Sequence, residues 1–395
     1  MAEGADFGMK KRSAMMRALL GELRRREGEM LRLLGRLVCC ESPSESKAAV
    51  DRLGRIVARE WRKRGAWVRV LSQKNRGNHL RTELWLGAGE PAGQITVLGH
   101  LDTVYPIGTL AKMPFGISDR RAWGPGILDM KAGLVLALFA ADALLLADLR
   151  PRKRLVFFFN SDEEIGSETS RRAIESEARR SDAVLVLEPA LGREGLLKTA
   201  RKGTGSVEIS VTGRAAHAGI EPEKGVNAVH ELALQIARLV QLNDAARGIT
   251  VQANVISGGA VSNVVADRAR AEVDIRYSRV ADGRRIEREL RALRPILPGA
   301  RIKISGGINR PPLERTAAVE KLFRHAQSLM RAAGLPLGEG STGGGSDGNF
   351  TAALGVPTLD GLGAVGDGAH SPREHVVIRS LPRRAALLAG LLATL

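Results

Sequence analysis

The 395-residue sequence contains two cysteines, few aromatic residues and no apolar run long enough to cross a membrane. Cys39 and Cys40 are neighbours, which excludes a disulfide framework, favours a reducing compartment and predicts a role in core packing. Glu22 and Arg24 to Arg26 interrupt the apolar residues before a secretory signal can form. The most apolar stretch, Leu134 to Leu146, falls far short of the ~20 residues of a membrane span and predicts a buried helix. We therefore expect a cytoplasmic protein without a membrane partner.

Acidic residues are fewer than basic ones: the chain has 43 Asp and Glu residues and 60 Lys and Arg residues, which give a net charge of +17. Such a charge is compatible with a nucleic-acid or membrane-surface partner. However, the basic residues are scattered in pairs such as Arg179 and Arg180, and aromatic residues for base stacking make up only 4%. We expect a solvated, arginine-rich surface and no nucleic-acid partner.

Three short apolar stretches each end abruptly in histidine or acidic residues, at 93–104, 154–164 and 182–189. Helical patterns precede them at 14–40 and 46–64. Strands that alternate with helices predict an α/β domain, and ligands in such domains bind at the carboxyl ends of the strands. The polar residues at these three ends are therefore expected to lie close together.

The pattern changes between residues 202 and 310, where alternating strands and helices at 226–239 and 284–293 follow a β-α-β-β-α-β order. This order is typical of an open-faced α+β sandwich. The α/β character returns after Pro311, with a helix at 317–333. The expected organisation is a first catalytic segment at 1–201, an inserted domain at 202–310 and a second catalytic segment at 311–395.

The polar residues at the predicted strand ends include two histidines, several carboxylates and no thiolate: His100, Asp102, Asp129, Glu163, Glu164, Glu188 and His370. Nitrogen and oxygen donors suit Zn²⁺ or a related first-row metal. A single zinc ion does not use so many carboxylates, whereas two ions roughly 3.5–4 Å apart would absorb their charge. These residues alone do not tell which of the two adjacent glutamates binds metal and which moves a proton.

Six segments occur in a fixed order, GHLDTVYP, GPGILDMKAG, NSDEEIGS, LEPA, GRAAHAG and GAHSPREH. In their order and spacing the chain resembles, over nearly its whole length, the di-zinc metallopeptidase family that contains glutamate carboxypeptidase of the carboxypeptidase G type, aminoacylase, succinyl-diaminopimelate desuccinylase and peptidase T. The glutamate carboxypeptidase branch is the most similar, because of LEP and the loop TGGGSD. The resemblance implies a catalytic domain with a mixed sheet flanked by helices, and an inserted α+β lid or dimerisation domain.

The resemblance also implies roles for individual residues. Asp129 matches a carboxylate that bridges two Zn²⁺ ions, with Co²⁺ or Mn²⁺ as substitutes, and the bond after it matches a non-proline cis peptide. His100 and Glu188 match the other ligands of one ion, and Glu164 and His370 those of the second.

Three further residues are expected to take part in catalysis, two of them by the resemblance and Asp102 by its spacing from His100. Glu163 matches the general base. Asp102 lies two residues after His100 on an extended segment, so it can accept the second imidazole N–H and orient the ring. His217, in GRAAHAG, matches a histidine that polarises the scissile carbonyl in the active site of the partner subunit. Asp162 has no matching role and is expected to be solvated or to cap a helix.

Polar positions around the substrate carboxylate are matched by Asn263, Arg276 and Arg310. The glycine-rich loop from Thr342 to Ser346, which includes Gly344, can offer backbone N–H groups to the same carboxylate, with a plain flexible turn as the alternative. Arginine suits this task because its planar fork binds a carboxylate through two parallel hydrogen bonds. The basic residue expected after LEP to bind an acidic side chain has no clear match, so a preference for C-terminal glutamate stays open.

We therefore expect a homodimeric zinc hydrolase that cleaves an amide bond next to a free carboxylate in a small peptide. An N-acyl-amino-acid amidohydrolase of the aminoacylase or desuccinylase type is the alternative. A catalytically dead homologue that acts as a basic binding protein is a second alternative, although the complete ligand set and Glu163 argue against it.

Overall fold

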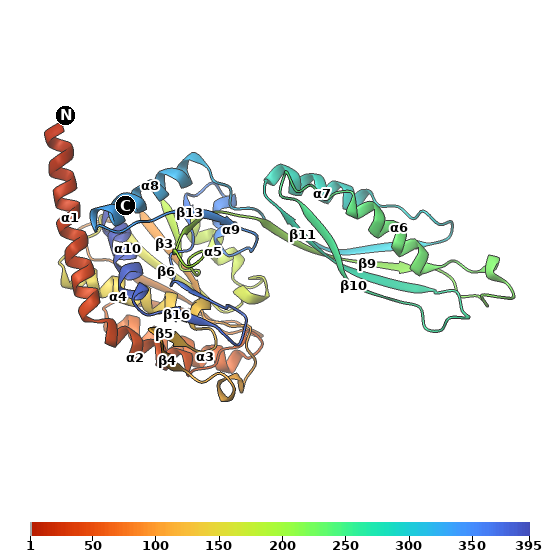
Figure 1. The fold of residues 1–395 in the computed structure, drawn as a ribbon, viewed down its shortest axis with the longest axis horizontal. Helices are drawn as coiled ribbons and strands as arrows, with labels where there is room; N and C mark the ends of the chain where they lie inside the picture. Colours follow the sequence, from red (N-terminus) through yellow and green to blue (C-terminus); the bar gives the residue numbers. More distant parts are fainter. Residues whose placement is uncertain (1) are drawn as a thin grey trace. The chain divides into compact units, whose positions relative to one another are not determined.

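The computed structural model describes residues 2–395, which divide into two compact units (Figure 1). The first unit contains the chain up to Ala200 together with Arg315–Ser341 and Ser346–Leu395. The second contains Arg201–Glu314 and the short segment Thr342–Gly345. The mixed α/β architecture predicted from the sequence is confirmed.

A six-stranded mixed sheet forms the centre of the first unit. Strands β6, β3, β7 and β14 run parallel to one another, while β2 is antiparallel to β6 and β1 is antiparallel to β2. In sheet order the strands are β1 (Trp67–Leu71), β2 (His79–Leu84), β6 (Arg154–Asn160), β3 (Gln94–His100), β7 (Ala183–Val186) and β14 (Thr358–Leu359).

Both faces of this sheet are covered, because successive side chains on a strand point to opposite faces. Phe157 and Phe159 point into the large core on one face, where the Phe157 ring lies 4.2 Å from the ring of Trp61 between centroids. Phe158 points to a smaller cluster on the other face, together with Ile174. Continuous apolar strands such as β6 are therefore buried on both sides, as parallel strands usually are.

Helices supply the rest of the core in the first unit. Almost every residue of α4 (Ala132–Leu146) is buried, so the predicted buried helix is confirmed. The other helices of this unit are α1 (Ala2–Arg25), α2 (Glu27–Val38), α3 (Lys47–Lys63), η1 (Thr109–Ala111), η2 (Ile127–Lys131), η3 (Glu163–Ile165), α5 (Arg171–Ala178), α8 (Ala317–Ala332), α9 (Gly348–Ala353) and α10 (Ser380–Thr394). Among residues 2–395, none of the helices has both the length and the apolar character that a membrane crossing requires.

A small four-stranded sheet brings two distant segments of the first unit together. His375 of β16 pairs with Trp123 of β5 in antiparallel register, and the two rings lie 4.6 Å apart between centroids. In sheet order its strands are β15 (Gly366–Asp367), β16 (His375–Val377), β5 (Arg121–Trp123) and β4 (Gly116–Ser118). A further pair is formed by β8 (Leu197–Arg201) and β13 (Glu339–Thr342).

The second unit has the predicted β-α-β-β-α-β order, with four antiparallel strands in the order β10-β11-β9-β12 (Figure 1). Its own apolar core lies between this sheet and two helices. The elements are β9 (Gly203–Thr212), η4 (Pro222–Lys224), α6 (Ala228–Val240), β10 (Thr250–Gly258), β11 (Arg268–Tyr277), α7 (Val280–Ala292) and β12 (Arg301–Arg310).

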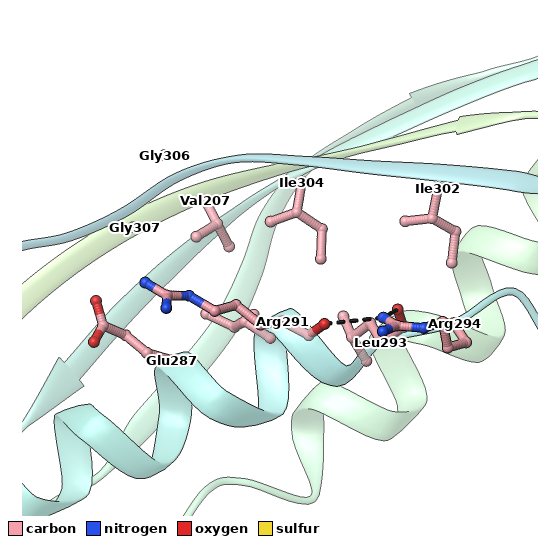
Figure 2. Close-up of a pocket in the computed structure, with 10 residues that line it drawn as sticks. Val207, Glu287, Arg291, Leu293, Arg294, Ile302, Ile304, Gly306 and Gly307 are labelled. Carbon is pink, nitrogen blue, oxygen red and sulfur yellow. Dashed lines mark hydrogen bonds between the residues drawn. The ribbon is translucent and has the colours of Figure 1, made fainter.

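A groove of ≈ 400 Å³ runs between α7 and the strands β9 and β12 (Figure 2). Val207, Ile302 and Ile304 point from the strands toward the helix. Arg294 donates hydrogen bonds to the carbonyl oxygens of Arg291 and Leu293 at 2.9 and 2.8 Å. The groove contains one carboxylate, Glu287, and no histidine, so it does not have the donors of a metal site.

Three details of the predicted structure are wrong. The helix expected at 14–40 is divided at Arg26 into α1 and α2. Helix α7 begins at Val280, four residues before the predicted start, since strand β11 ends at Tyr277 and leaves room for an earlier turn. Cys39 is exposed where helix α2 ends, so it does not pack in the core, whereas Cys40 is partly buried.

Candidate metal centre

The candidate ligands converge because parallel strands end at the same edge of the central sheet. His100 is the last residue of β3 and stands in register with Asn160, the last residue of β6. Glu163 and Glu164 follow Asn160 in the turn η3, and Glu188 follows two residues after the end of β7. The structure thus brings the three apolar strands of the sequence analysis to one polar edge.

Asp129 lies between the two histidines of this edge. Its Oδ1 is 3.0 Å from Nε2 of His100, and its Oδ2 is 3.5 Å from Nε2 of His370. His100 Nε2 is also 3.6 Å from Oε1 of Glu188, and His370 Nε2 is 3.3 Å from Oε2 of Glu164. Each oxygen of Asp129 therefore faces a different histidine and carboxylate pair. The bond between Asp129 and Met130 is cis.

Glu163 lies in the same cluster. One of its carboxylate oxygens is within 4.8 Å of ligand atoms of both His100 and Glu188. A second set of donors within the same distance consists of His100, Asp129 and Glu164. Both adjacent glutamates therefore lie close to metal-ligating atoms, and proximity alone does not separate their roles.

Asp102 holds the backbone of the turn that carries these glutamates. Its buried carboxylate accepts hydrogen bonds from the N–H groups of Glu163 and Glu164 at 3.3 and 3.2 Å, and from the Ser44 hydroxyl at 2.7 Å. Nδ1 of His100 lies 3.0 Å from the backbone oxygen of Asp102 and 3.5 Å from its carboxylate. Asp102 thus orients the imidazole and the catalytic turn together.

Glu374 is a site residue that the sequence analysis missed. Its buried carboxylate accepts hydrogen bonds from the backbone N–H groups of Gly126, Leu128 and Asp129 at 2.9, 2.8 and 2.9 Å. These contacts fix the loop that presents Asp129. Glu374 is the acidic residue of the segment GAHSPREH, four residues after His370. The sequence did not indicate its role because its partners lie some 245 residues earlier in the chain.

Of the two positions expected for Asp162, the solvated one is wrong, whereas the residue does stand at the N-cap of η3, without a side-chain capping bond. Its side chain is buried and accepts hydrogen bonds from the N–H and hydroxyl groups of Thr169, both at 2.7 Å, and from the Ser170 hydroxyl at 2.6 Å. Asn160 donates to Asp347 at 2.8 Å in the same network. A buried carboxylate needs several donors. These hydrogen bonds hold the loop 162–170, which carries the two glutamates.

Charge is concentrated at this edge. Burial favours the neutral imidazole of His100, yet Asp102 and Asp129 outweigh burial and raise its pKa well above the usual range. Hydrogen bonds to Asp129 and Glu164 raise the pKa of His370 to about 10. Burial raises the pKa of Glu164, and His370 offsets only part of that rise. The raised pKa values favour protonated imidazoles, and a metal ion that binds the same nitrogens displaces those protons.

The donor set fits metal ions. Oε1 of Glu164 is buried and has no hydrogen-bond partner in the described part of the chain. Within residues 2–395, Asp129 and Glu164 form ion pairs only with histidines and with no lysine or arginine. A buried carboxylate oxygen without a partner is costly, and a divalent cation would satisfy it. We conclude that this edge is a candidate metal-binding site.

His217 and Asn263 are neighbours in the second unit. The N–H group of Ala218 donates to the backbone oxygen of Asn263 at 2.9 Å, and His217 forms a β-bridge with Val264. Nδ1 of the exposed His217 accepts hydrogen bonds from the N–H groups of Gly219 and Ile220 at 3.2 and 3.1 Å. In the neutral ring the proton then resides on Nε2, which can donate to a carbonyl oxygen.

The other predicted substrate-binding residues also lie in the second unit. Arg276 of β11 and Arg310 of β12 both pair in register with Thr204 of β9, so they flank it on one face of the sheet. Arg276 forms an ion pair with Asp274 at 2.8 Å, whereas Arg310 is buried.

The loop with Thr342 and Gly344 packs against these strands. Arg201, which the sequence analysis did not assign, donates from Nη1 to the backbone oxygens of Gly344 and Gly345 at 3.0 and 3.1 Å. A Cβ atom added at Gly345 would come within 2.9 Å of the Arg310 side chain. Glycine therefore permits the close contact between this loop and Arg310.

Comparison with known proteins agrees with this geometry. The family model for peptidase family M20/M25/M40 matches residues 96–394. The chain is 35% identical to carboxypeptidase G2 of Pseudomonas sp. (strain RS-16) over 311 residues, which cover 78% of this chain and 75% of that protein. It is 28% identical to succinyl-diaminopimelate desuccinylase of Dechloromonas aromatica (strain RCB) over 342 residues, covering 80% and 86% of the two chains.

A solved structure shares the fold. The YXEP protein of Bacillus subtilis, described as a dinuclear metal-binding peptidase, superimposes with a TM-score of 0.68 and 14% identity, covering 94% of this chain and 98% of its own.

Proposed function

The chain belongs to peptidase family M20/M25/M40 and is a metal-dependent hydrolase, and we propose that it uses two Zn²⁺ ions to hydrolyse an amide bond next to a free carboxylate. The observation that carries the proposal is the arrangement around Asp129, whose two oxygens each face a separate histidine at 3.0 and 3.5 Å. Co²⁺ or Mn²⁺ are alternative metals for the same donors.

Five residues would hold the ions: His100, Asp129, Glu164, Glu188 and His370. Asp129 would be shared between them. When bound, such ions supply acidified water and polarise the scissile carbonyl.

Glu163 is the proposed general base. It accepts a proton from the attacking water on its carboxylate and delivers that proton to the departing amine, so that no net charge is left on the leaving group. Asp102 fixes the N–H group of Glu163 at 3.3 Å, which keeps the carboxylate beside His100 and Glu188. A base held in this way needs little reorganisation at the moment of proton transfer.

Two isosteric variants test this assignment. Glu163→Gln is expected to keep both metal ions and substrate affinity but to lose roughly two to four orders of magnitude in kcat. Glu164→Gln is expected to lose metal as well. We would measure metal content by mass spectrometry and steady-state kinetics on the same preparations. Together the two measurements tell which glutamate binds metal and which moves the proton. If Glu163→Gln strips the metal and Glu164→Gln spares it, the two roles are reversed.

The proposed substrate is a small peptide cleaved in the manner of a carboxypeptidase. Support comes from the likeness to carboxypeptidase G2 and from the cluster of Arg310 and the loop 342–345, which suits a carboxylate. An N-acyl-amino-acid amidohydrolase is the second candidate, because the chain is also 28% identical to a desuccinylase. A hydrolysis screen over dipeptides and N-acyl amino acids distinguishes the two.

We also propose a homodimer that forms through the second unit, with His217 serving the metal centre of the partner subunit. Nε2 of His217 would donate a hydrogen bond to the oxyanion that develops during the reaction, a contact commonly worth ~2.7–4 kcal/mol. The two free cysteines support a reducing, cytoplasmic location.

A further inference from the structure

A second cavity in the first unit contains none of the candidate metal ligands. It has a volume of ≈ 510 Å³ and lies between the β4–β5 turn, strand β16, the end of α8 and the start of α10. Its wall includes His375, whereas the preceding residue, Glu374, binds the Asp129 loop. Neighbouring residues of an extended chain point to opposite sides, so the cavity and the metal centre lie on different sides of this segment.

Positive charge dominates the lining of this cavity. Three carboxylates (Asp119, Glu194 and Asp367) and six arginines line it: Arg120, Arg121, Arg193, Arg379, Arg383 and Arg384. Two of the arginines have partners. Arg384 is buried and donates to backbone oxygens, including that of Gly363 at 2.8 Å, and Arg121 lies over the Trp123 ring at 5.9 Å.

The other four arginines have open guanidinium groups. Arg120, Arg193, Arg379 and Arg383 have no ion pair and no side-chain hydrogen bond within the described residues 2–395. Arg379 and Arg383 are four residues apart at the start of α10, so their side chains lie on the same side of the helix. The cavity thus offers several guanidinium donors to an anionic ligand.

The floor of the cavity is apolar. Met330 and Val365 are buried, and the partly buried Leu335, Leu337 and Val377 complete the surface. An apolar floor with charged groups at the rim is typical of sites for small organic molecules, which commonly have volumes of about 300–1,000 Å³. Inorganic ions alone would leave this floor in contact with water.

The backbone at the rim is held in an uncommon conformation. Asp119 and Arg120 form the turn between β4 and β5 with φ angles of 48° and 60°. Such turns favour Asn and Gly, because a Cβ atom destabilises the left-handed region. The N–H group of Ile378 donates to the backbone oxygen of Arg120 at 3.1 Å and ties this turn to the segment before α10.

We propose that this cavity binds an amphipathic organic anion, in which a carboxylate or phosphate group contacts the open arginines and a small apolar body covers the floor. The proposal does not depend on the hydrolytic function. It also assigns a role to part of the chain's excess of positive charge.

Isothermal titration of the full-length protein with octanoate and with octyl phosphate tests the proposal and distinguishes the two kinds of head group. Octanamide and inorganic phosphate serve as comparison probes, because each retains only one half of the ligand. At least one amphipathic anion is expected to bind at least tenfold more tightly than both comparison probes. Its binding should weaken as salt is added, since exposed charges are screened.

The double variant Arg379→Gln/Arg383→Gln is expected to lose tenfold or more in affinity for that anion. The matched control is Arg55→Gln/Arg59→Gln, which removes two exposed arginines with the same spacing from α3 and should bind as the native protein does. Thermal unfolding of both variants verifies that they are folded.

Three results would overturn the proposal. One is equal binding of the amphipathic anions and the comparison probes. Another is equal loss of affinity in both double variants, which would indicate nonspecific attraction to a basic protein. The third is binding that survives in Arg379→Gln/Arg383→Gln but disappears after chelation, because the anion would then occupy the metal centre.

Discussion

Replacing Glu374 by glutamine tests whether the loop that presents Asp129 is held by a buried carboxylate. Oε1 of Glu374 accepts from Leu128 and Asp129, and Oε2 accepts from Gly126. A glutamine can keep the first two bonds with its amide oxygen, but its NH₂ group then faces the N–H of Gly126. One buried donor loses its acceptor, at about 1–3 kcal/mol, and two charge-assisted bonds become neutral. We expect the free energy of unfolding to fall by about 2–4 kcal/mol.

The metal centre should weaken in the same variant. Partners that orient metal ligands typically contribute 10–100-fold to metal affinity, and Glu374 orients Asp129 through its backbone. Urea denaturation measures the free energy of unfolding, and competition with a chelating dye measures the affinity for Zn²⁺. The two measurements together separate a general loss of stability from a loosened site.

Glu41→Gln is the matched control. Glu41 also accepts two backbone hydrogen bonds, from Gly108 and Leu110 at 2.9 and 2.8 Å, but this loop carries no candidate ligand. We expect it to unfold at a slightly lower urea concentration and to bind zinc as tightly as the native protein. A Glu374→Gln protein with native zinc affinity and a free energy of unfolding within about 0.5 kcal/mol of native would refute the reasoning.

Three other predictions concern the substrate, the dimer and acid stability. If Arg310 binds the substrate carboxylate, amidation of that carboxylate should strongly reduce turnover by the native enzyme and reduce turnover by Arg310→Ala much less. Additive losses of turnover in this double-mutant cycle would contradict the contact. If His217 acts in the partner subunit, co-expression of the Glu163→Ala and His217→Ala chains should restore about a quarter of native activity, and mixed dimers without activity would contradict it. Burial lowers the pKa of His79, so the native state binds fewer protons than the unfolded chain and loses stability as the pH falls below about 6.5. The variant His79→Gln should flatten this part of the plot of unfolding free energy against pH. An unchanged slope would show that other groups cause the loss of stability.

Local patterns predicted much of the fold. The apolar runs of β3, β6 and β7 and the polar residues after them were sufficient to place a ligand site at one edge of an α/β sheet. The β-α-β-β-α-β order of the second unit followed from alternation and helical spacing. Helix boundaries were less accurate, as at Arg26 and Val280, because capping and packing rather than composition decide where a helix ends.

Long-range contacts accounted for the residues that the sequence analysis missed or misplaced. A solvated or capping position was expected for Asp162, since nothing in the segment 162–164 indicates that Thr169 and Ser170 return to cover its side chain. Glu374 stood unassigned beside His370 for the same reason. A carboxylate's partners are backbone N–H groups that carry no sequence signal of their own.

The sequence by itself determined the chemistry available to this protein: nitrogen and oxygen donors at strand ends, a family order of segments, and an excess of arginine. Only the tertiary structure decided how these groups are combined. It placed the two oxygens of Asp129 toward different histidines and buried Oε1 of Glu164 without a partner among residues 2–395. It also grouped arginines from three separate segments, unpaired within the same described residues, around one apolar floor. The physical reason is that side-chain types follow from the sequence, whereas distances between residues far apart in the chain follow from packing of the sheet, its helices and the connecting loops.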